Sequence, residues 1–254
     1  MRTNHRIAAL IPARAGSKRV KLKNISPLNG HPLIAYTISA ALESSEFSDV
    51  VVSTDSEIIA EISSHYGAEV PFLRPSELSG DLSPDIEWVE FTLKMLLKQG
   101  RSYNCFSILR PTSPFRQVAT IKRAINQFFR YDGFDSLRAV ELCKQHPGKM
   151  WVVEGNRMKP LLSGGRADLP WHSMPYQALP KVYVQNASLE IAWTRVVSES
   201  RSISGNVIMP FLTEGNEGFD INDRYDWIHA EYLIRTGEAV LPDVLRKPYI
   251  RVLA

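Results

Sequence analysis

The chain has 254 residues, of which 44% are hydrophobic and 22% are charged. This length and composition suit one large globular domain, with room for a small appendage. The 30 basic and 27 acidic residues leave a formal net charge of only +3, so the overall charge gives no reason to expect nucleic-acid binding. A local basic site for a small anion remains open.

The cysteines and the N-terminal stretch exclude several further classes. Cys105 and Cys143 are far apart, and the histidines form no H-x-x-x-H pair, so we expect neither a zinc site nor a disulfide scaffold. The apolar run before Pro12 is too short for a signal-peptide core or a membrane span. We therefore expect a cytoplasmic protein with no membrane or nucleic-acid partner.

The first half of the chain alternates between strand-like and helix-like patterns. Continuous apolar runs predict buried strands at 6–11, 49–54 and 103–109. Helical spacing of apolar residues predicts helices at 32–44, 55–66, 83–98 and 117–130, with Ser83 as the N-cap of the third and Gly67 as the end of the second. Such alternation predicts an α/β fold with a mostly parallel sheet flanked by helices. Ligands of such sheets bind at the carboxyl ends of the strands.

The pattern changes after about residue 140. Residues 143–182 are rich in proline and glycine and contain two short strand-like runs, together with Trp151 and Trp171. They could form a long surface loop or an inserted hairpin that exposes the tryptophans for docking. We favour the hairpin, because long insertions of this kind are usually functional. A strand at 188–194 and a helix at 223–235 follow.

A basic loop follows the first strand. Residues 11–24 read IPARAGSKRVKLKN and hold five cations around Gly16. The loop matches neither the Walker A pattern nor the dinucleotide fingerprint. Gly16 would still let backbone N–H groups approach an anion, and Arg14 could clamp two phosphate oxygens. From this loop alone, a triphosphate site and a solvated turn are equally acceptable interpretations.

Two further polar stretches are candidates for the same site. LRPTSPFR (109–116) follows the strand at 103–109, and GFDINDRYDW (218–227) precedes the last helix. Asp220 and Asp223 could both hold a hard cation such as Mg²⁺. We interpret Asp223 as a helix N-cap and Asp226 as a first-turn acid instead. Asp220 lies before the helix and is freer to be a metal ligand.

Five motifs, in order, resemble one known family. They are I-P-A-R-A-G-S-K with a following K-N, R-P-x-x-L-x-x-D-x-S (74–83), R-P-T-S-P-F-R, Y-x-x-N (183–186) and D-I-N-x-x-x-D (220–226). Together they resemble the acylneuraminate cytidylyltransferases, which include the CMP-sialic acid synthetases and relatives acting on legionaminic and pseudaminic acids. The resemblance covers roughly residues 6–236. The pair Lys23-Asn24 favours this branch over the enzymes that activate the eight-carbon sugar Kdo.

The resemblance implies a reaction and an architecture. CTP and an acidic nine-carbon 2-keto sugar would give a CMP-sugar and pyrophosphate, with Mg²⁺ as cofactor. The fold would be a Rossmann-like α/β domain spanning 1–254, with 143–182 as an inserted dimerisation arm. The protein would be a homodimer in which this arm reaches the neighbouring active site.

The resemblance also implies roles for individual residues. It makes Arg14, Lys23 and Asp220 catalytic, and Asp220 and Asn222 metal ligands. The nucleotide-binding positions are Ala13, Arg14, Gly16, Ser17, Lys18, Lys23, Asn24, Arg74 and Ser83. The sugar-binding positions are Arg110, Thr112, Ser113, Gln177, Tyr183 and Asn186.

Four departures from the family pattern leave alternatives open. Arg110 and Tyr176 stand where glutamine and arginine are usual, and Ala187 replaces a glycine. They leave the acceptor open between a nonulosonic acid and another acidic sugar or a phosphonate. Asn222 replaces a second acid, so a nucleotide-sugar-binding protein without catalysis is also an alternative. Arg110 would either hold the sugar carboxylate or pair with a nearby acid such as Asp81.

Overall fold

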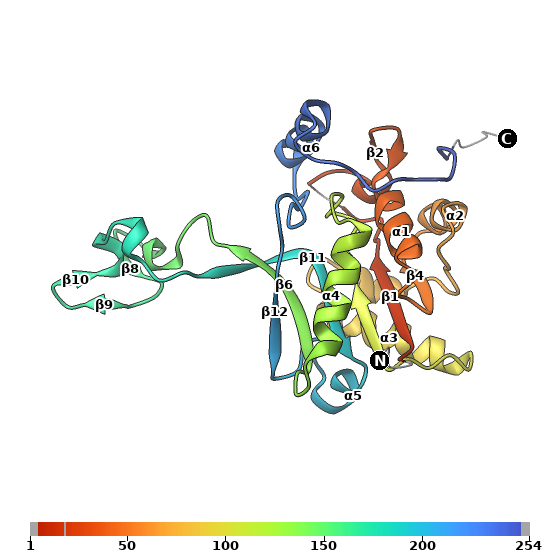
Figure 1. Cartoon of the computed structure of the whole chain (residues 1–254), viewed down its shortest axis with the longest axis horizontal. Helices are drawn as coiled ribbons and strands as arrows, with labels where there is room; N and C mark the ends of the chain where they lie inside the picture. Colours follow the sequence, from red (N-terminus) through yellow and green to blue (C-terminus); the bar gives the residue numbers. More distant parts are fainter. Residues whose placement is uncertain (1–4, 18, 250–254) are drawn as a thin grey trace. The chain divides into compact units, whose positions relative to one another are not determined.

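The computed structural model describes residues 5–17 and 19–249, and Lys18 lies outside the described residues. Its main sheet has six strands in the order β12-β6-β11-β5-β1-β4 (Figure 1). These strands are β1 (Ile7–Pro12), β4 (Asp49–Ser53), β5 (Cys105–Ile108), β6 (Ser136–Leu142), β11 (Tyr183–Trp193) and β12 (Ile208–Leu212). β1 pairs in parallel with both β4 and β5, whereas β11 runs antiparallel to β5. The sheet is therefore mixed but mostly parallel, as the alternating pattern predicts.

The described residues form six α-helices around this sheet. They are α1 (Leu33–Ser44), α2 (Glu57–His65), α3 (Asp85–Lys98), α4 (Val118–Arg130), α5 (Arg195–Ser200) and α6 (Arg224–Thr236). Local signals fix several ends: the Ser56 hydroxyl accepts from Ile59 N at the start of α2. Gly67, which follows the last turn of this helix, has a φ of +97° that an L side chain rarely adopts.

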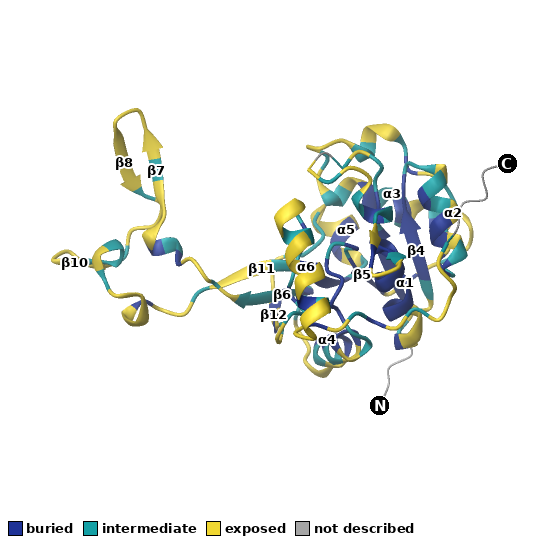
Figure 2. Cartoon of the chain, turned by 90° about the horizontal axis from the view of Figure 1, so that it is seen from above, coloured by how far each residue is buried: buried dark blue, intermediate teal, exposed yellow. Residues whose placement is uncertain are grey.

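Strand β1, which lies between β5 and β4, is buried on both faces because helices cover both sides of the sheet. Ile7, Ala9 and Ile11 pack in one apolar cluster with α1, α2 and α4. Ala8 and Leu10 pack in a second cluster with α3 and α5. Figure 2 shows the resulting buried layer, in dark blue, along β4, β5 and α1. A third cluster joins α6 to the start of α1.

The chain divides into two compact units. The first comprises residues 1–139 and 186–254, and the second comprises residues 140–185. The second unit contains the hairpin of β7 (Trp151–Glu154) and β8 (Arg157–Pro160), the short pair β9 (Gly165–Arg166) and β10 (Leu169–Pro170), and the 3₁₀ turns η3 (Pro147–Lys149), η4 (Trp171–Ser173) and η5 (Tyr176–Ala178). In the first unit, short elements complete the fold: η1 (Lys23–Ile25), β2 (Pro27–Leu28), β3 (His31–Pro32) and η2 (Ser76–Ser79).

The structure differs from the sequence-based prediction at one helix cap and in three elements that were not predicted. Ser83 does not cap α3: Pro84 is the N-cap residue, and the Ser83 hydroxyl donates to the Glu77 carbonyl at 3.1 Å instead. The strands β6 and β12 and the short helix α5 were not predicted. The other predicted strands and helices of the first unit are present, with ends shifted by a few residues.

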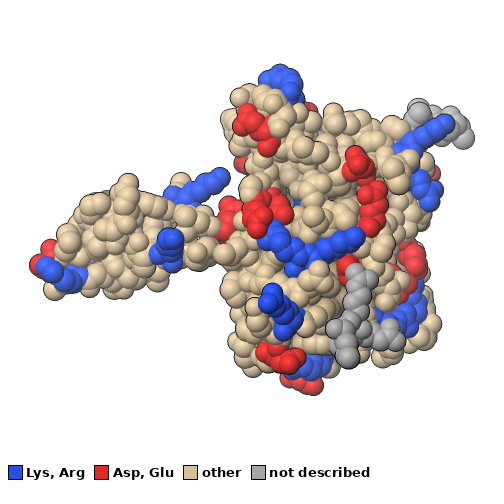
Figure 3. All heavy atoms as spheres, in the orientation of Figure 1, with Lys and Arg blue, Asp and Glu red and all other residues tan. Residues whose placement is uncertain are grey.

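The surface shows no large region of one charge on the face drawn in Figure 3, where basic side chains form small groups, several of them beside acidic ones. Within the described part of the chain, no helix combines the length and apolar character that crossing a bilayer requires.

Candidate active site

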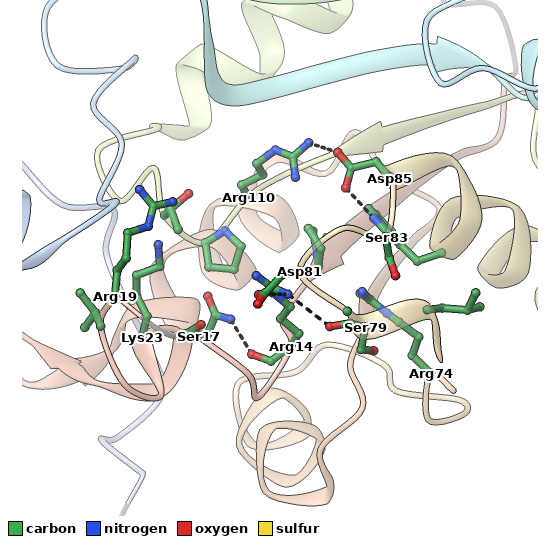
Figure 4. Close-up of a pocket in the computed structure, with 18 of the residues that line it drawn as sticks. Arg14, Ser17, Arg19, Lys23, Arg74, Ser79, Asp81, Ser83, Asp85 and Arg110 are labelled. Carbon is green, nitrogen blue, oxygen red and sulfur yellow. Dashed lines mark hydrogen bonds and ion pairs between the residues drawn. The ribbon is translucent and has the colours of Figure 1, made fainter. Parts of the chain in front are cut away.

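A polar cavity of about 290 Å³ opens where β1 and β5 end (Figure 4). Because β1 and β5 are parallel, the loops after them start at the same edge of the sheet. Nine of the residues singled out in the sequence line this cavity: Arg14, Ser17, Lys23, Asn24, Arg74, Ser83, Arg110, Thr112 and Asn222. The basic loop is therefore part of a cavity and not an isolated solvated turn.

The basic loop folds back on the neighbouring strand through its backbone. Ala13 N donates to Ser53 O at 3.0 Å, and Ala15 N donates to the Asp55 carboxylate at 2.8 Å. The Asn24 amide closes the loop by donating to Arg14 O at 3.3 Å. An added Cβ at Gly16 would meet nothing within 4 Å, so this glycine borders open space. The loop thus presents its polar groups to the cavity.

Two cations of this loop are held by the surrounding chain. The Arg14 guanidinium lies 2.9 Å from the Asp81 carboxylate and 3.3 Å from Ser79 O, as Figure 4 shows. Lys23 Nζ donates to Ile221 O at 2.7 Å, which ties the loop to the segment before α6. Burial lowers the pKa of Lys23, and the nearby Asp220 carboxylate offsets part of this shift.

Asp220 has one carboxylate oxygen engaged and one free. Its Oδ2 accepts from the Asn222 amide at 2.8 Å. Its Oδ1 is buried and has no hydrogen-bond partner among the described residues. A buried carboxylate oxygen without a partner is costly, and a hard cation would satisfy it. No group of three His, Cys, Asp or Glu side chains suited to a metal occurs within 5–17 and 19–249. The oxygens that could hold a cation at this place belong to Asp220 and to the amide of Asn222.

Asp223 and Asp226 have the structural roles predicted from the sequence. The Asp223 carboxylate accepts from Tyr225 N and Asp226 N at the start of α6. The Asp226 carboxylate in turn accepts from Asp223 N at 3.1 Å. The two acids form a capping box and are occupied by it.

Arg74 braces the end of β4 as well as lining the cavity. Its Nε donates to Ser53 Oγ at 3.1 Å and its Nη2 to Ser53 O at 2.6 Å. Its guanidinium lies over the Trp88 ring, 5.0 Å from the ring centroid. Burial lowers the pKa of Arg74 to about 10, although Asp55 and Asp85 act in the opposite direction. Arg74 is therefore held rigidly at the wall of the cavity.

Arg110 is paired with acids, but not with Asp81. Its Nη2 lies 2.6 Å from Asp85 Oδ2 and 3.0 Å from Glu190 Oε1. The other Glu190 oxygen lies 2.9 Å from the Arg138 guanidinium. Asp81, the partner suggested from the sequence, pairs with Arg14 instead.

The loop after Arg110 is fixed by buried contacts. Thr112 O accepts from Ile221 N at 2.8 Å, which joins this loop to the Asp220 segment. Ser113 is buried, and its hydroxyl lacks a hydrogen-bond partner among the described residues. Arg116 is only 1% exposed and donates to Ser188 O and Arg110 O. Burial lowers the pKa of Arg116 to about 9.

The remaining predicted sugar-binding residues do not line the cavity. In the first unit, Asn186 donates to Thr213 Oγ1 at 2.9 Å and accepts from Ser188 N at 3.2 Å. Gln177 and Tyr183 belong to the second unit, where both are exposed.

Several lining residues were not predicted. Arg19, Asp85 and Trp88 all border the cavity. Arg19 stands in the basic loop, where its charge was noted without a role. Asp85 and Trp88 lie in the first turn of α3, shortly after the predicted nucleotide-binding residue Ser83. This closeness to Ser83 in the sequence was the signal that could have identified them as lining residues.

The topology and the cation-lined cavity at the strand ends define an α/β protein suited to an anionic nucleotide. The profile of the family described as "Cytidylyltransferase" matches residues 8–138 of this chain. A CMP-N,N'-diacetyllegionaminic acid synthase from Legionella pneumophila is 36% identical over 239 residues, covering 93% of this chain and 99% of that protein. The chain belongs to the cytidylyltransferase family.

Another relative matches most of the chain, and a solved structure shares its fold. An N-acylneuraminate cytidylyltransferase from Escherichia coli is 31% identical over 231 residues, which cover 89% of this chain and 51% of that protein. The structure of a CMP:2-keto-3-deoxy-manno-octonic acid synthetase complexed with CTP superposes with a TM-score of 0.64 over 91% of this chain and 99% of that chain, at 13% identity. At that identity the structural likeness concerns the fold alone.

Proposed function

We propose that this protein transfers CMP from CTP to the anomeric hydroxyl of a nonulosonic acid and releases pyrophosphate. The observation that carries the proposal is the cavity itself, in which Arg14, Lys23 and Asn24 of one loop meet Arg74 and Ser83 of another. The relatives named above, which act on legionaminic and acylneuraminic acids, support the same choice of substrates.

The basic loop is suited to hold the triphosphate. In the proposed reaction the sugar hydroxyl attacks the α-phosphorus while pyrophosphate leaves in line, so negative charge grows on the leaving oxygens. Arg14 and Lys23 stabilise this charge, and Ser17 adds a hydroxyl. Asn24, Arg74 and Ser83 hold the cytosine and its ribose. To clamp the phosphates, Arg14 exchanges its contact with Asp81 for one with the nucleotide.

Asp220 and Asn222 are the residues that would hold Mg²⁺. The partnerless Asp220 Oδ1 fits this role, and an amide oxygen is an acceptable second ligand. A bound Mg²⁺ would neutralise phosphate charge and lower the pKa of the attacking hydroxyl. Lys23, which the Asp220 carboxylate influences electrostatically, would then complete the positive charge around the phosphates.

The choice of nucleotide is the direct test. Pyrophosphate release should be faster with CTP than with UTP, ATP or GTP, because Asn24 and Arg74 offer donors and an acceptor to the edge of a pyrimidine. The acceptor panel should contain sialic, legionaminic, pseudaminic and Kdo acids. Equal rates with all four nucleotides would refute the assignment of CTP. CTP binding without turnover for any acceptor would favour the alternative of a non-catalytic nucleotide-sugar-binding protein.

The assembly and the location belong to the same proposal. The predicted homodimer is supported by the hairpin β7–β8, whose cross-strand pairs place Trp151, Val153, Met158 and Pro160 on one face. Trp151, Val153 and Met158 are 37%, 70% and 60% exposed. The cytoplasm stays the predicted location.

A further inference from the structure

Arg110 is the centre of a cluster of four charged side chains that the reaction proposed above does not explain. Asp85 and Glu190 both accept from the same atom, Arg110 Nη2, and Glu190 also contacts Arg138. Two positive and two negative groups make the cluster neutral. A neutral cluster offers little attraction to a substrate carboxylate, although the cation at its centre lines the cavity.

The donors of Arg110 are unevenly used. Its Nη2 donates one hydrogen to Asp85 Oδ2 at 2.6 Å and the other to Glu190 Oε1 at 3.0 Å. Its Nε and Nη1 have no hydrogen-bond partner among the described residues. A guanidinium has two edges that offer a pair of parallel N–H bonds: one is formed by Nε and Nη2, and the other by Nη1 and Nη2. Nη2 therefore belongs to both edges. A substrate carboxylate can therefore bind to Arg110 through two parallel bonds only by displacing Asp85 or Glu190.

The two acids differ in what displacement would cost. The Asp85 side chain is 32% exposed and lines the cavity, so water can solvate it once it is released. The Glu190 side chain is 5% exposed, on the interior strand β11. Releasing Glu190 from Arg110 would leave one oxygen of a buried carboxylate without its cation, with Arg138 holding only the other oxygen, and breaking a buried ion pair is destabilising. Displacing Asp85 from Arg110 therefore costs less free energy than displacing Glu190.

Both acids have a second contact that fits these separate roles. Asp85 Oδ1 accepts from the Trp88 indole N–H at 2.7 Å, so the carboxylate keeps a partner when it leaves Arg110. Glu190 is fixed from behind by Arg138, 2.9 Å away. Burial alone would raise the pKa of Asp85, but Arg110 lowers it below its ordinary value, so Asp85 is ionised at neutral pH.

We propose that Asp85 is an exchangeable carboxylate that occupies Arg110 until the carboxylate of the acceptor replaces it, while Glu190 is a permanent partner that positions Arg110. This inference rests on the proposed function and deepens it, because it makes the acceptor a sugar acid whose carboxylate takes the place of Asp85. An acceptor in which the carboxylate is converted to an amide cannot make the exchange and is excluded.

The proposal predicts that substitutions of Asp85 and Glu190, which both contact Arg110 Nη2, change the acceptor KM in opposite directions. Asp85→Asn removes the competing charge and should lower the acceptor KM about threefold to tenfold. Glu190→Gln releases Arg110 and should raise the acceptor KM about 10- to 150-fold, the range of a lost charge-assisted contact. The CTP KM should barely move in either variant. Glu87→Gln is the matched control, because Glu87 lies in the same first turn of α3 and does not line the cavity.

A second pair of variants covers the case in which Glu190→Gln fails to fold. Arg110→Gln should raise the acceptor KM on its own, and Asp85→Asn should have no further effect on that KM in the Arg110→Gln background. An Asp85→Asn variant that weakens acceptor binding, or that acts equally with and without Arg110, would overturn the proposal.

Binding without turnover separates this inference from the proposed reaction. Calorimetric titration of CTP-loaded protein with the acid panel, in the absence of Mg²⁺, reports acceptor affinity alone. If Asp85→Asn and Glu190→Gln change the acceptor affinity in opposite directions but the wild type releases no pyrophosphate, only the proposed reaction is rejected. If the wild type turns over normally but both variants change the acceptor affinity in the same direction, only the proposed exchange at Arg110 is rejected.

Discussion

Lys23 connects the basic loop to the segment that carries Asp220. Its pKa is lowered from 10.5, mainly by burial, so this cation loses its proton at a lower pH than an ordinary lysine. In the window below 10.5, the unfolded chain binds this proton more readily than the folded protein does. The contribution of Lys23 to stability therefore rises with pH there, while the charge that would bind phosphates disappears.

This opposition gives the first prediction. The kcat/KM for CTP should fall as pH rises through the lowered pKa of Lys23 in the free enzyme. Lys23→Arg keeps the charge and should move that fall to higher pH. Lys21→Arg, at an exposed position of the same loop, is the control and should leave the profile unchanged. Thermal melts at the same pH values exclude unfolding as the cause. An identical profile for Lys23→Arg would mean that Lys23 does not carry the charge.

The partnerless oxygen of Asp220 gives the second prediction. Asp220→Asn should raise the Mg²⁺ concentration needed for half-maximal rate by about tenfold or more, since tenfold corresponds to only about 1.4 kcal/mol. Asp223→Asn removes a charge from the same segment and keeps a good N-cap, so its Mg²⁺ requirement should stay that of the wild type. The measurement is a Mg²⁺ titration of pyrophosphate release. Equal Mg²⁺ requirements for all three proteins would remove Asp220 from the metal site.

At the scale of elements, helix α6 holds the Asp220 segment in place through its capping box. Asp223→Ala removes the side chain that accepts from Tyr225 N and Asp226 N. We expect it to lower the free energy of unfolding by about 1 kcal/mol, while Asp223→Asn should cost little. Urea unfolding of the three proteins checks this. Equal losses for alanine and asparagine would show that the charge, and not the cap, is what α6 needs.

The sequence predicted those elements whose signals are local. The buried run at 49–54 and the capped helix at 223–235 are recognisable because burial on both faces and a capping box each leave a pattern in adjacent residues. β6 and β12 left no such pattern: β12 reads IMPFL and alternates between exposed and buried positions, around a proline. Their place in the sheet depends on pairing with distant strands, which local patterns do not reveal.

The residues of the site also fall into those with a local sequence signal and those that only the fold brings together. Residues of the basic loop were predicted because they are contiguous and follow a strand. The partners of Arg110 were missed, since Asp85 and Glu190 lie 25 and 80 residues away along the chain. Only the packing of α3 and β11 around the end of β5 brings these acids together. The sequence offered Asp81 at a similar separation, but the fold places that residue beside Arg14.

At the scale of the whole molecule, the hairpin β7–β8 of the second unit has two unlike faces. Its cross-strand pairs put Val153 opposite Met158 on one face, and Glu154 opposite Arg157 on the other. Figure 3 shows few charged side chains on the drawn face of this unit. Exposed apolar side chains on a paired, rigid surface are typical of protein–protein contacts, and the predicted partner is a second copy of this chain.

The last prediction concerns this contact. The protein should be a dimer at micromolar concentration, and the double variant Val153→Glu and Met158→Glu should make it a monomer, because two charges would be buried in the contact without partners. Lys159→Glu changes the net charge by the same amount on the opposite face of the hairpin and should leave the dimer intact. Light scattering coupled to gel filtration distinguishes the two states. A monomeric wild-type protein would refute the dimer. A dimer that survives the double variant but not Lys159→Glu would place the contact on the charged face.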